Sequence, residues 1–360
     1  MNFLSLKSEA FGLDISDLSL KIAKLKKKGK FLSLASWGET EIKPGLIEEG
    51  EIKDENGLAE SIKKSLSQIR GEKLKTNYVV VSLPEKKAFL QVIQMPKMEK
   101  EELEEALPFE AENYVPLPIE KVYLDFQIIP PVQDGLDHLD ILIAAFPRET
   151  INPYVGAIKK AGLLAAVLEI ESQSISRALI KNELSPGPVF IVDFGRSRTS
   201  FIIFSGYSLR FTTSIPISSH HLTEGISKTL KLDLIEAEKL KIKYGLGKTK
   251  RSKIFNAMVP ALTDLAEQIK KHIDYYQSHA SHEHLPPNGK RIEKIILCGR
   301  GANLKGFPDF LSKELGIPTE LGNPWLNILP EPLKEVPELP FEESLGYTTA
   351  LGLALRGIKD

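Results

Sequence analysis

The sequence predicts an α/β protein built from two related halves, and three observations carry that prediction. Strand-like and helix-like patterns alternate along the 360 residues, which is typical of layered α/β structure. The stretch FGLDISDLSLKI (11–22) consists of a strand, an aspartate, a turn and a second strand. The same order returns in VFIVDFGRSRTSFIIF (189–204). Two such hairpins, at Asp14 and Asp193, predict a duplicated core in which each half supplies one side of a cleft.

The composition is that of an ordinary soluble protein, with 42 % hydrophobic and 26 % charged residues. Its 47 basic and 48 acidic residues leave no net field over the whole chain that would attract nucleic acid or anionic lipid. The single cysteine, Cys298, excludes a disulfide within the chain and fits a reducing compartment. Lys7 and Glu9 interrupt the first apolar residues too early for a secretory signal, and no apolar run approaches the roughly 18 residues of a membrane span. We therefore expect a cytoplasmic protein that does not bind nucleic acid.

The first half begins with a hairpin and continues with a helix and a buried strand. LSLKIAKL (18–25) and KFLSLASWGE (30–39) are predicted strands joined by the lysine-rich tip KKKGK (26–30). That tip would suit a membrane surface or an acidic partner, but a solvated turn is the commoner use of such a sequence. LAESIKKSLSQI (58–69) has its apolar residues on one helical face, and NYVVVSLP (77–84) has the continuous apolar character of a strand buried on both faces.

A change of pattern between Ala88 and Ile170 predicts a separate inserted subdomain. Its order is strand, helix, strand, strand, helix, strand, which is that of a small split βαβ unit. These elements are expected at 88–96, 100–114, 122–130, 139–147, 149–162 and 163–170. Pro108 lies inside the first helix and is expected to kink or divide it. The glutamates of that helix favour a solvated face over a binding surface for a basic partner.

The second half adds helices after its hairpin. Helical patterns occur at LIEAEKLKIKY (234–244) and at ALTDLAEQIKKHIDYY (261–276), and the strand KIILCG (294–299) follows them. The apolar residues of the second helix lie on one face and are expected to point into the core. They are Leu262, Leu265, Ala266, Ile269, Ile273 and Tyr276.

Two motifs in this half resemble sites without meeting their requirements. GLGKT (245–249) is similar to part of a Walker loop, but Ile242 stands where the first glycine is required and the segment follows a helix. Gly245 is more simply explained as the end of that helix. The histidines after the long helix are interpreted as part of a polar loop, because no further metal ligand is placed near them. They are His279, His282 and His284.

The second hairpin carries the residue types that a phosphate site requires. Such a site needs backbone N–H groups that point inward from a turn, which glycine permits, and a carboxylate that holds Mg²⁺ through water. Asp193 ends a strand and Gly195 allows the turn. Thr199 and Ser200 then offer hydroxyl groups.

The first hairpin meets these requirements in part. Asp14 ends its strand, and Lys21 faces away from the apolar side, where it would reach a phosphate. Ser16 stands where glycine is expected. Asp17 adds a negative charge close to where a phosphate would lie, which is unfavourable unless a cation compensates it.

A third segment, LCGRGANLKGFPDFL (297–311), runs from a strand through Gly299 and Gly301 into a helix. Glycines at such a corner let the backbone lie against a flat ring, although an ordinary strand-to-helix turn has the same pattern. Together, and in this order, the three segments resemble the actin-like ATPase superfamily. They correspond to its first phosphate hairpin, its second phosphate hairpin and its adenosine loop.

The predicted insert narrows the resemblance to the branch that contains the division protein FtsA and the pilus assembly protein PilM. Four stretches are similar to the PilM family in particular, and the resemblance covers nearly the whole chain. They are VIQMPKMEKEELEEALPFEAENYVPLPIEKVYLDFQII (92–129), HLTEGISKTLKLDLIEAEKLK (221–241), LGIPTELGNPW (315–325) and GYTTALGLALR (346–356).

The resemblance implies a two-lobed actin-like fold, which is a duplicated ribonuclease H-like architecture with a small βαββαβ subdomain inserted in it. Lobe I would comprise residues 1–87 together with 171–187 and 341–360. The inserted subdomain would span 88–170. Lobe II would span 188–340, with a mostly helical part at about 225–290.

The resemblance also implies a cleft that binds ATP with Mg²⁺. Asp14 and Asp193 would hold the Mg²⁺ and its waters. The other implied contacts are Ser16, Lys21, Gly195 and Thr199 at the phosphates, Glu238 and Lys241 at the ribose and adenine, and Gly299, Gly301 and Ala302 beside the base. The resemblance implies no catalytic residue.

PilM-like proteins sit at the cytoplasmic face of the inner membrane. They bind the short cytoplasmic tail of the membrane protein PilN and help couple the pilus alignment complex to the assembly motor. The resemblance therefore implies a PilN-like partner and contacts with motor components, and it leaves room for self-association. The chain would reach the membrane only through its partners.

Several positions depart from the family pattern, and they keep other functions open. Ser16 replaces a glycine, Asp17 a small hydroxyl residue, Ser218 and Ser219 a glycine pair, and Arg300 interrupts another glycine pair. These changes favour weak or purely structural nucleotide binding over appreciable hydrolysis. A nucleotide-free scaffold for the same complex is the main alternative. An FtsA-like division protein is less favoured, because LGLALRGIKD (351–360) is not followed by an amphipathic membrane helix, and a sugar kinase is a weaker option still.

Overall fold

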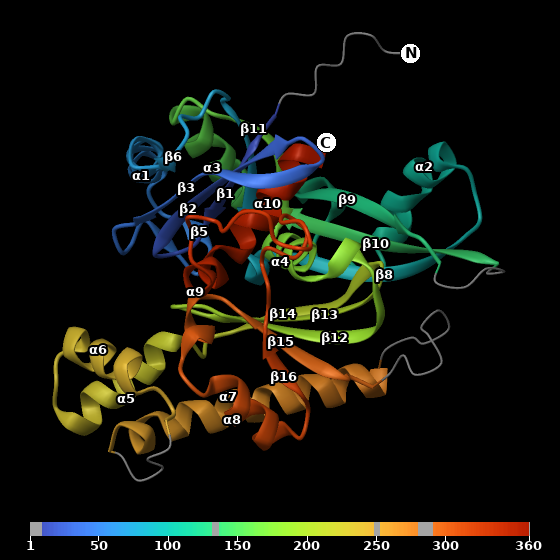
Figure 1. The fold of residues 1–360 in the computed structure, drawn as a ribbon. Coiled ribbons are helices and arrows are strands. Elements are labelled where there is room, and N and C mark those ends of the chain that lie inside the picture. The colour runs from blue at the N-terminus through green and yellow to red at the C-terminus, as the bar shows by residue number, and fades with distance from the viewer. Residues whose placement is uncertain (1–8, 132–136, 248–252, 280–290, 360) are drawn as a thin grey trace.

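The computed structural model describes residues 9–131, 137–247, 253–279 and 291–359. Two large β-sheets with their helices form two stacked lobes, and a smaller sheet extends from one side of the upper lobe (Figure 1). We call the upper lobe, which holds the first strands of the chain, lobe I, and the other lobe II. The two termini of the described chain lie close together on lobe I, where the backbone N–H of Ala10 donates to the carbonyl of Gly357 at 3.2 Å.

The two large sheets share one strand topology. In each, three antiparallel strands form a meander, and two further strands lie on the other side of the first strand and run parallel to it. The lobe I order is β11-β7-β1-β2-β3-β6, with bounds Leu164–Ile170, Tyr78–Leu83, Phe11–Ile15, Ser19–Lys28, Phe31–Glu41 and Arg70–Gly71. The lobe II order is β14-β13-β12-β15-β16, with bounds Ser208–Ile215, Thr199–Gly206, Ser185–Phe194, Lys294–Cys298 and Thr319–Leu321. The predicted duplicated core is therefore confirmed.

Two helices lie between the sheets and connect the lobes. α4 (Glu171–Leu179) follows the last strand of lobe I, and α10 (Thr348–Lys359) is the final helix (Figure 1). α10 packs on β1, β2 and β7, while α4 contacts α10 and also β13 and β14 of lobe II. The two helices lie in close contact where Gly352 of α10 faces Ser174 of α4. A Cβ at residue 352 would lie 1.9 Å from the backbone carbonyl oxygen of Ser174. Only glycine allows this approach.

The remaining helices outside the insert flank the two lobes (Figure 1). On lobe I, α1 (Glu55–Ser67) packs on β2 and β3 and against α3 (Arg148–Lys160). Lobe II carries α5, α6, α7 and α8, with bounds Ser219–Leu230, Leu234–Tyr244, Lys253–His279 and Phe307–Leu315. All six residues of the predicted α7 stripe are buried in the lobe II core. The smaller elements are β4 (Ile47–Glu48), β5 (Glu51–Ile52) and α9 (Phe341–Ser344).

The structure corrects the inserted subdomain. Only its first four elements form a separate unit, which we call the insert: the sheet β8-β10-β9 with α2, whose bounds are Phe89–Pro96, His138–Pro147, Val122–Ile129 and Lys100–Ala111. β11 instead pairs in parallel with β7, and α3 packs on α1. The physical reason is that β7 is a strand buried on both faces, which needs a parallel neighbour on each side. The insert thus interrupts a strand–helix–strand unit of lobe I.

Pro108 does not divide the first helix of the insert. α2 runs as one helix from Lys100 to Ala111 and places Pro108 in its last turn. A proline there removes one backbone donor close to the helix end. Within the described residues, no helix is both long and apolar enough to cross a membrane.

The contact between α4 and α10 yields a stability prediction. Gly352→Ala should lower the free energy of unfolding by about 1–3 kcal/mol, because the new methyl group forces the helices apart. In an isolated helix the same substitution would raise stability by about 1 kcal/mol, because alanine is the better helix former. A loss of stability therefore reports the contact between the helices. Urea denaturation measures the change. Gly187→Ala is the matched control, because a Cβ at residue 187 would have open space within 4 Å. Equal stability of the two variants would contradict the close approach.

Candidate functional site

A crevice of about 310 Å³ lies between the lobes, where the two hairpins meet. Asp14, at the end of β1, and Asp193, at the end of β12, both line it. The strand pairing places Lys21 directly opposite Asp14 and Ser200 directly opposite Asp193. Residues opposite one another in an antiparallel pair share a face of the sheet, so each aspartate enters the crevice with a polar neighbour.

Asp14 is buried and held by two polar partners. The Ser82 hydroxyl donates to its Oδ1 at 3.0 Å, and the Lys21 Nζ lies 3.7 Å from its Oδ2. Burial raises the pKa of Asp14, and the charge of Lys21 partly offsets that effect. The lysine therefore faces a carboxylate in the lobe I half of the crevice.

Asp193 is half-buried and has less compensation than Asp14. Burial and then the charge of Asp14 raise its pKa to about 6. The Cys298 thiol donates to its Oδ1 at 3.8 Å. Gly299 has a φ of +80°, and a Cβ at that residue would lie 2.3 Å from the same oxygen. A glycine is required there because any side chain would collide with the carboxylate.

Two further acids at the crevice were missed by the sequence reasoning. Glu171 is the first residue of α4, and Glu85 lies in the short 3₁₀ turn η1 (Glu85–Lys87) that follows β7. Burial raises the pKa of both, and the charges of Asp14, Asp193 and Glu85 raise that of Glu171 further, well above its ordinary value. The signal available in the sequence is an acid close after a strand, since Glu171 directly follows β11 and only Pro84 separates Glu85 from β7.

The crevice contains more acidic than basic side chains. Eight carboxyl groups and five cationic groups line it, the latter being Lys21, Lys86, Arg196, Arg198 and Arg300. An excess of acid around a crevice, with Asp14 and Glu85 buried, disfavours a bare anion and favours a ligand that brings a cation. Within the described ranges, no three His, Cys, Asp or Glu side chains come close enough to hold a metal ion. The residues therefore fit a divalent cation that is held mainly through water.

Six of the eleven predicted nucleotide contacts line this crevice: Asp14, Ser16, Lys21, Asp193, Gly195 and Gly299. Thr199 does not, because it is buried and its hydroxyl donates to the Ile217 carbonyl at 2.6 Å. Ser200 lines the crevice in its place. The alternation of a strand explains the difference, since neighbouring residues point to opposite faces.

The predicted adenosine contacts other than Gly299 lie outside the crevice. Gly301 and Ala302 are buried in the 3₁₀ turn η4 (Arg300–Asn303). Glu238 and Lys241 form an ion pair of 2.8 Å on α6. The Lys241 Nζ also donates to the carbonyl and hydroxyl oxygens of Ser219, at 2.9 and 2.8 Å. The structure thus brings six of the predicted residues together at one crevice, and their roles toward a nucleotide remain predictions.

The altered family positions have partners of their own. The Gly50 backbone N–H donates to Asp17 at 3.0 Å, so this carboxylate is anchored to the β4–β5 turn. The Ser16 hydroxyl bonds with Ser19, and that of Ser218 with His221. Such contacts reduce the cost of Asp17 at the crevice without removing its charge.

Two ion pairs join the lobes at the mouth of the crevice. Arg300 of lobe II pairs with Glu39 on β3, and Arg196 of the second hairpin lies 3.2 Å from Glu41 on the same strand. All four side chains line the crevice. They hold the mouth narrow, but exposed pairs of this kind contribute only about 0–1 kcal/mol each and open readily.

Comparison with known proteins identifies the family. The sequence matches the family of the type IV pilus assembly protein PilM over residues 12–358. The chain belongs to this family. A solved PilM-PilN type IV pilus biogenesis complex is similar over 98 % of this chain and 100 % of that one, with 28 % identity and a TM-score of 0.79. The predicted family and the two-lobed actin-like fold are therefore confirmed.

More distant structures share the fold of this PilM-family chain. MreB5 of Spiroplasma citri bound to AMPPNP has a TM-score of 0.55 and 14 % identity, over 98 % of this chain and 97 % of that one. The ethanolamine utilization protein EutJ of Carboxydothermus hydrogenoformans has a TM-score of 0.54 and 15 % identity, over 96 % and 89 %. At these identities the likeness concerns the fold alone.

Curated relatives with sequence similarity are FtsA cell division proteins. That of Helicobacter pylori is 35 % identical over 86 residues, which are 24 % of this chain and 18 % of the relative. That of Pseudomonas aeruginosa is 23 % identical over 220 residues, which are 56 % and 50 %. The chain thus spans half or less of these relatives.

The structure describes part of the GLGKT segment and part of the histidine segment. Gly245 ends α6 with a φ of +53°, and its N–H donates to the Lys241 carbonyl at 2.9 Å, as expected for a helix stop. His279 stacks on Tyr275, with ring centroids 4.4 Å apart. Lys248, Thr249, His282 and His284 lie outside the described residues.

The half-buried carboxylate of Asp193 yields a pH prediction. The folded protein holds its proton up to about pH 6, whereas an ordinary aspartate releases it near pH 3.8, so the stability that this group contributes is lost as pH rises between these values. The charge then costs of the order of 3 kcal/mol. Without divalent cations, Asp193→Asn should therefore be about 1–3 kcal/mol more stable than the parent above pH 7, and this gain should vanish near pH 4.

Urea denaturation at the two pH values measures this difference. Asp264→Asn on the exposed side of α7 is the matched control and should change stability little at either pH. A loss of stability in Asp193→Asn above pH 7 would show that this carboxylate is well compensated.

Proposed function

We propose that this PilM-family chain binds ATP with Mg²⁺ in the crevice between its lobes and binds the cytoplasmic tail of a PilN-like inner-membrane protein. It would thereby couple the pilus alignment complex to the assembly machinery and lie at the cytoplasmic face of the membrane through its partners. The observation that carries the nucleotide part is the convergence of Asp14 and Asp193, from two different sheets, on one crevice.

The crevice offers groups for the phosphate end of a nucleotide. Lys21 and Arg198 line it from opposite lobes and would contact phosphate oxygens. Asp14 and Asp193 would hold the waters of Mg²⁺, which when bound would neutralise part of the charge of phosphates and carboxylates alike. A volume of about 310 Å³ is at the small end of ligand sites, so we infer that the Arg300–Glu39 pair opens to admit the base.

We infer that any hydrolysis is slow. A general base must be ionised before it can accept a proton from water. Glu171 and Glu85, the acids added by the structure, have pKa values raised by burial. Their carboxyl groups are therefore poor bases until a cation enters the crevice.

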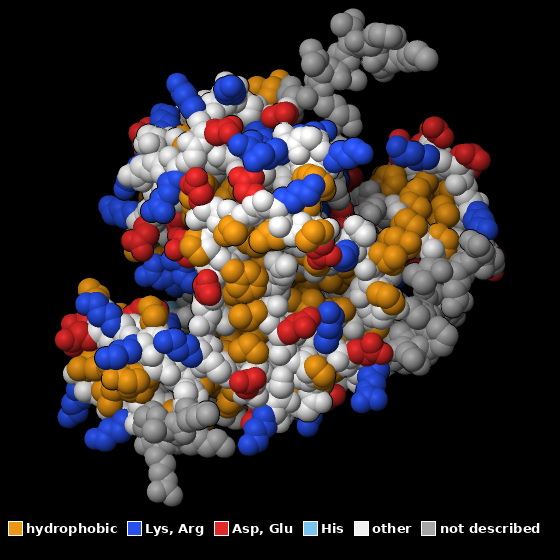
Figure 2. Space-filling model, in the orientation of Figure 1, with side chains coloured by type: hydrophobic (Ala, Val, Ile, Leu, Met, Phe, Trp, Pro, Cys, Tyr) orange, Lys and Arg blue, Asp and Glu red, His pale blue; other side chains and the backbone are white. Residues whose placement is uncertain are grey.

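A groove of about 550 Å³ between the insert and lobe I suits a partner peptide. β9 and β11 lie at the edges of their sheets, and residues of both line it. An edge strand can accept an extended peptide through backbone hydrogen bonds, with apolar side chains entering the groove. Its apolar lining includes Leu124, Phe126, Leu142 and Val155. Figure 2 shows hydrophobic side chains gathered over the insert beside lobe I.

The solved PilM-PilN complex supports the binding of a PilN-like tail by this chain, since the similarity, at 28 % identity, extends over 98 % of the sequence. We place the tail in the groove because the groove is apolar and bordered by two sheet edges. The groove and the crevice are also connected: Glu169 lines the groove, Glu171 lines the crevice, and the two are separated by one residue. Glu169 pairs with Arg177 of α4 in a buried contact. A change in the crevice would therefore reach the groove through the start of α4.

A nucleotide-free scaffold is the second candidate. The Arg300–Glu39 pair across the mouth and the negative charge of Asp17 both favour it. In that case the partner groove would act without any nucleotide, and the two tests below separate the candidates.

Calorimetric titration with Mg-ATP tests nucleotide binding. The parent protein should release or absorb measurable heat and gain thermal stability with ligand. Asp193→Ala should weaken binding at least about tenfold, because one of the two carboxylates that face the cation is lost. Asp264→Asn should bind like the parent. Absence of both heat and thermal protection in the parent would favour the scaffold.

A peptide from the cytoplasmic tail of a PilN-like protein tests the groove. Val155→Asp should weaken binding at least about tenfold by placing a charge among apolar side chains. Ile128→Asp is the matched control, because both side chains are 39 % exposed and Ile128 lies outside the groove. Fluorescence anisotropy of the labelled peptide measures both. Equal weakening by the two variants would place the tail elsewhere.

A further inference from the structure

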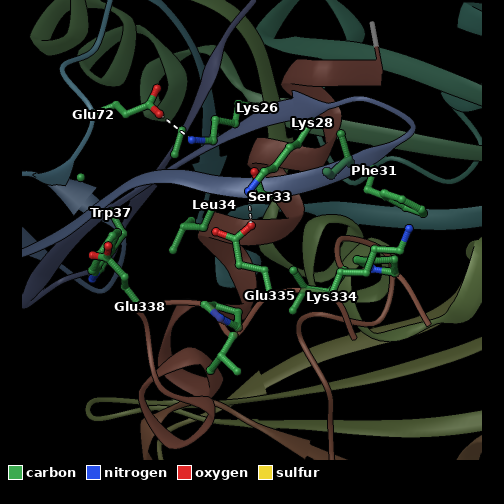
Figure 3. Close-up of a pocket in the computed structure, with 17 residues that line it drawn as sticks. Lys26, Lys28, Phe31, Ser33, Leu34, Trp37, Glu72, Lys334, Glu335 and Glu338 are labelled. Atoms are coloured by element: carbon green, nitrogen blue, oxygen red, sulfur yellow. Dashed lines mark hydrogen bonds and ion pairs between the residues drawn. The ribbon is translucent and has the colours of Figure 1, made fainter. Parts of the chain in front are cut away.

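The β2–β3 hairpin and a proline-rich segment enclose a hollow of about 650 Å³ on the outside of lobe I. The segment, residues 329–338, leaves lobe II and passes beside the hairpin, and we call it the strap. Figure 3 shows Phe31 and Lys334 on facing sides of this hollow, with the Lys334 ammonium 4.2 Å from the centre of the Phe31 ring. The hairpin and the strap thus form two adjacent prongs.

Large apolar side chains protrude from both prongs. Val336 on the strap is 79 % exposed, Leu333 is 56 % exposed, and Phe31 beside the hairpin tip is 37 % exposed. Leu333 and Val336 gain little from burial, and Phe31 leaves more than a third of its surface in water. Three such side chains on neighbouring prongs are expected to contact something outside the molecule.

The charges around these residues are positive on balance. Lys26 and Lys28 are neutralised by Glu72 and Glu335, each at 2.5 Å. Lys27 and Lys30 are exposed, and neither has an acidic partner within 4 Å among the described residues. Lys334, on the strap, adds a third positive charge beside Phe31, and the exposed Glu338, which also lines the hollow, offsets one of the three, so two positive charges remain. The patch formed by Lys27, Lys30, Phe31, Leu333, Lys334 and Val336 is therefore basic and apolar, and we call it the tip patch.

We propose that the tip patch binds directly to the surface of an anionic lipid bilayer. The lysines would lie at the headgroups, where each basic residue near the surface strengthens binding about fivefold. Phe31, Leu333 and Val336 would enter the boundary between headgroups and acyl chains. The strap suits that boundary because Pro330, Pro332 and Pro337 have no backbone N–H that would lose its bond to water there.

A bilayer fits the tip patch better than a folded partner. The protruding residues lie on two separate prongs with a hollow between them, which gives a folded surface no continuous face to match. Lipids adapt to such a shape. The contact would be weak and reversible by itself, since stable attachment to a membrane takes two signals. It goes beyond the proposed function, in which the membrane is reached only through partners.

Flotation with vesicles and without any partner peptide tests the proposal. The parent should bind vesicles made of equal parts phosphatidylcholine and phosphatidylglycerol, should not bind phosphatidylcholine alone, and should be released by high salt. Lys27→Glu combined with Lys30→Glu should lower binding at least about tenfold. Lys270→Glu combined with Lys271→Glu, on the exposed side of α7, changes the net charge equally and should bind like the parent. Absence of binding by the parent, or equal loss in both double variants, overturns the proposal.

A labelled cysteine tests whether the strap enters the lipid. The native Cys298 is buried, so Val336→Cys provides an accessible thiol for an environment-sensitive dye. Its emission should shift to the blue with anionic vesicles. The same dye at Ile235→Cys, on a 69 % exposed position of α6, should not respond. Binding without a shift at residue 336, or with equal shifts at both positions, excludes the tip patch. Neither result depends on ATP or on a PilN-like tail, so this proposal and the proposed function fail separately.

Discussion

The structure depends on one electrostatic constraint, which is that two carboxylates with little access to solvent, one from each large sheet, face the same crevice. Asp14 and Asp193 end the first strands of the two lobes and raise the cost of each other's charge. Glu171 adds a third acid from α4, the helix between the sheets. Such a cluster without enough positive charge lowers the stability of the fold, and we propose that a bound ligand supplies the missing cation.

The duplication of the core makes this arrangement available. Each sheet has the same meander followed by two parallel strands, so the end of each first strand occupies an equivalent place in its lobe. α4 and α10 hold the two sheets against each other, and the close approach at Gly352 sets the distance between these two helices. The insert and the groove beside it are joined to this frame through β11, which belongs to the lobe I sheet. One rigid connection thus links the two proposed binding sites.

The sequence predicts best what depends on neighbouring residues. The hairpins, the α7 stripe and the family could be recognised because alternation, periodicity and turn residues are local signals. The place of β11 could not, since strand pairing is decided by a partner about 85 residues away in the sequence. Thr199 was preferred to Ser200 although the pairing of Asp193 with Ser200 decides which hydroxyl faces the crevice. Glu171 was missed because its environment comes from both lobes.

The most direct test of the central claim is electron paramagnetic resonance of Mn²⁺ in the presence of ATP, with Mn²⁺ in place of Mg²⁺. The claim predicts one bound ion in the parent, and its affinity should fall at least about tenfold in Asp14→Asn and in Asp193→Asn alike. It also predicts that the double variant is little worse than either single one, because both carboxylates act on the same ion. An ion that is lost in one variant and bound normally in the other would contradict a site shared by the two lobes.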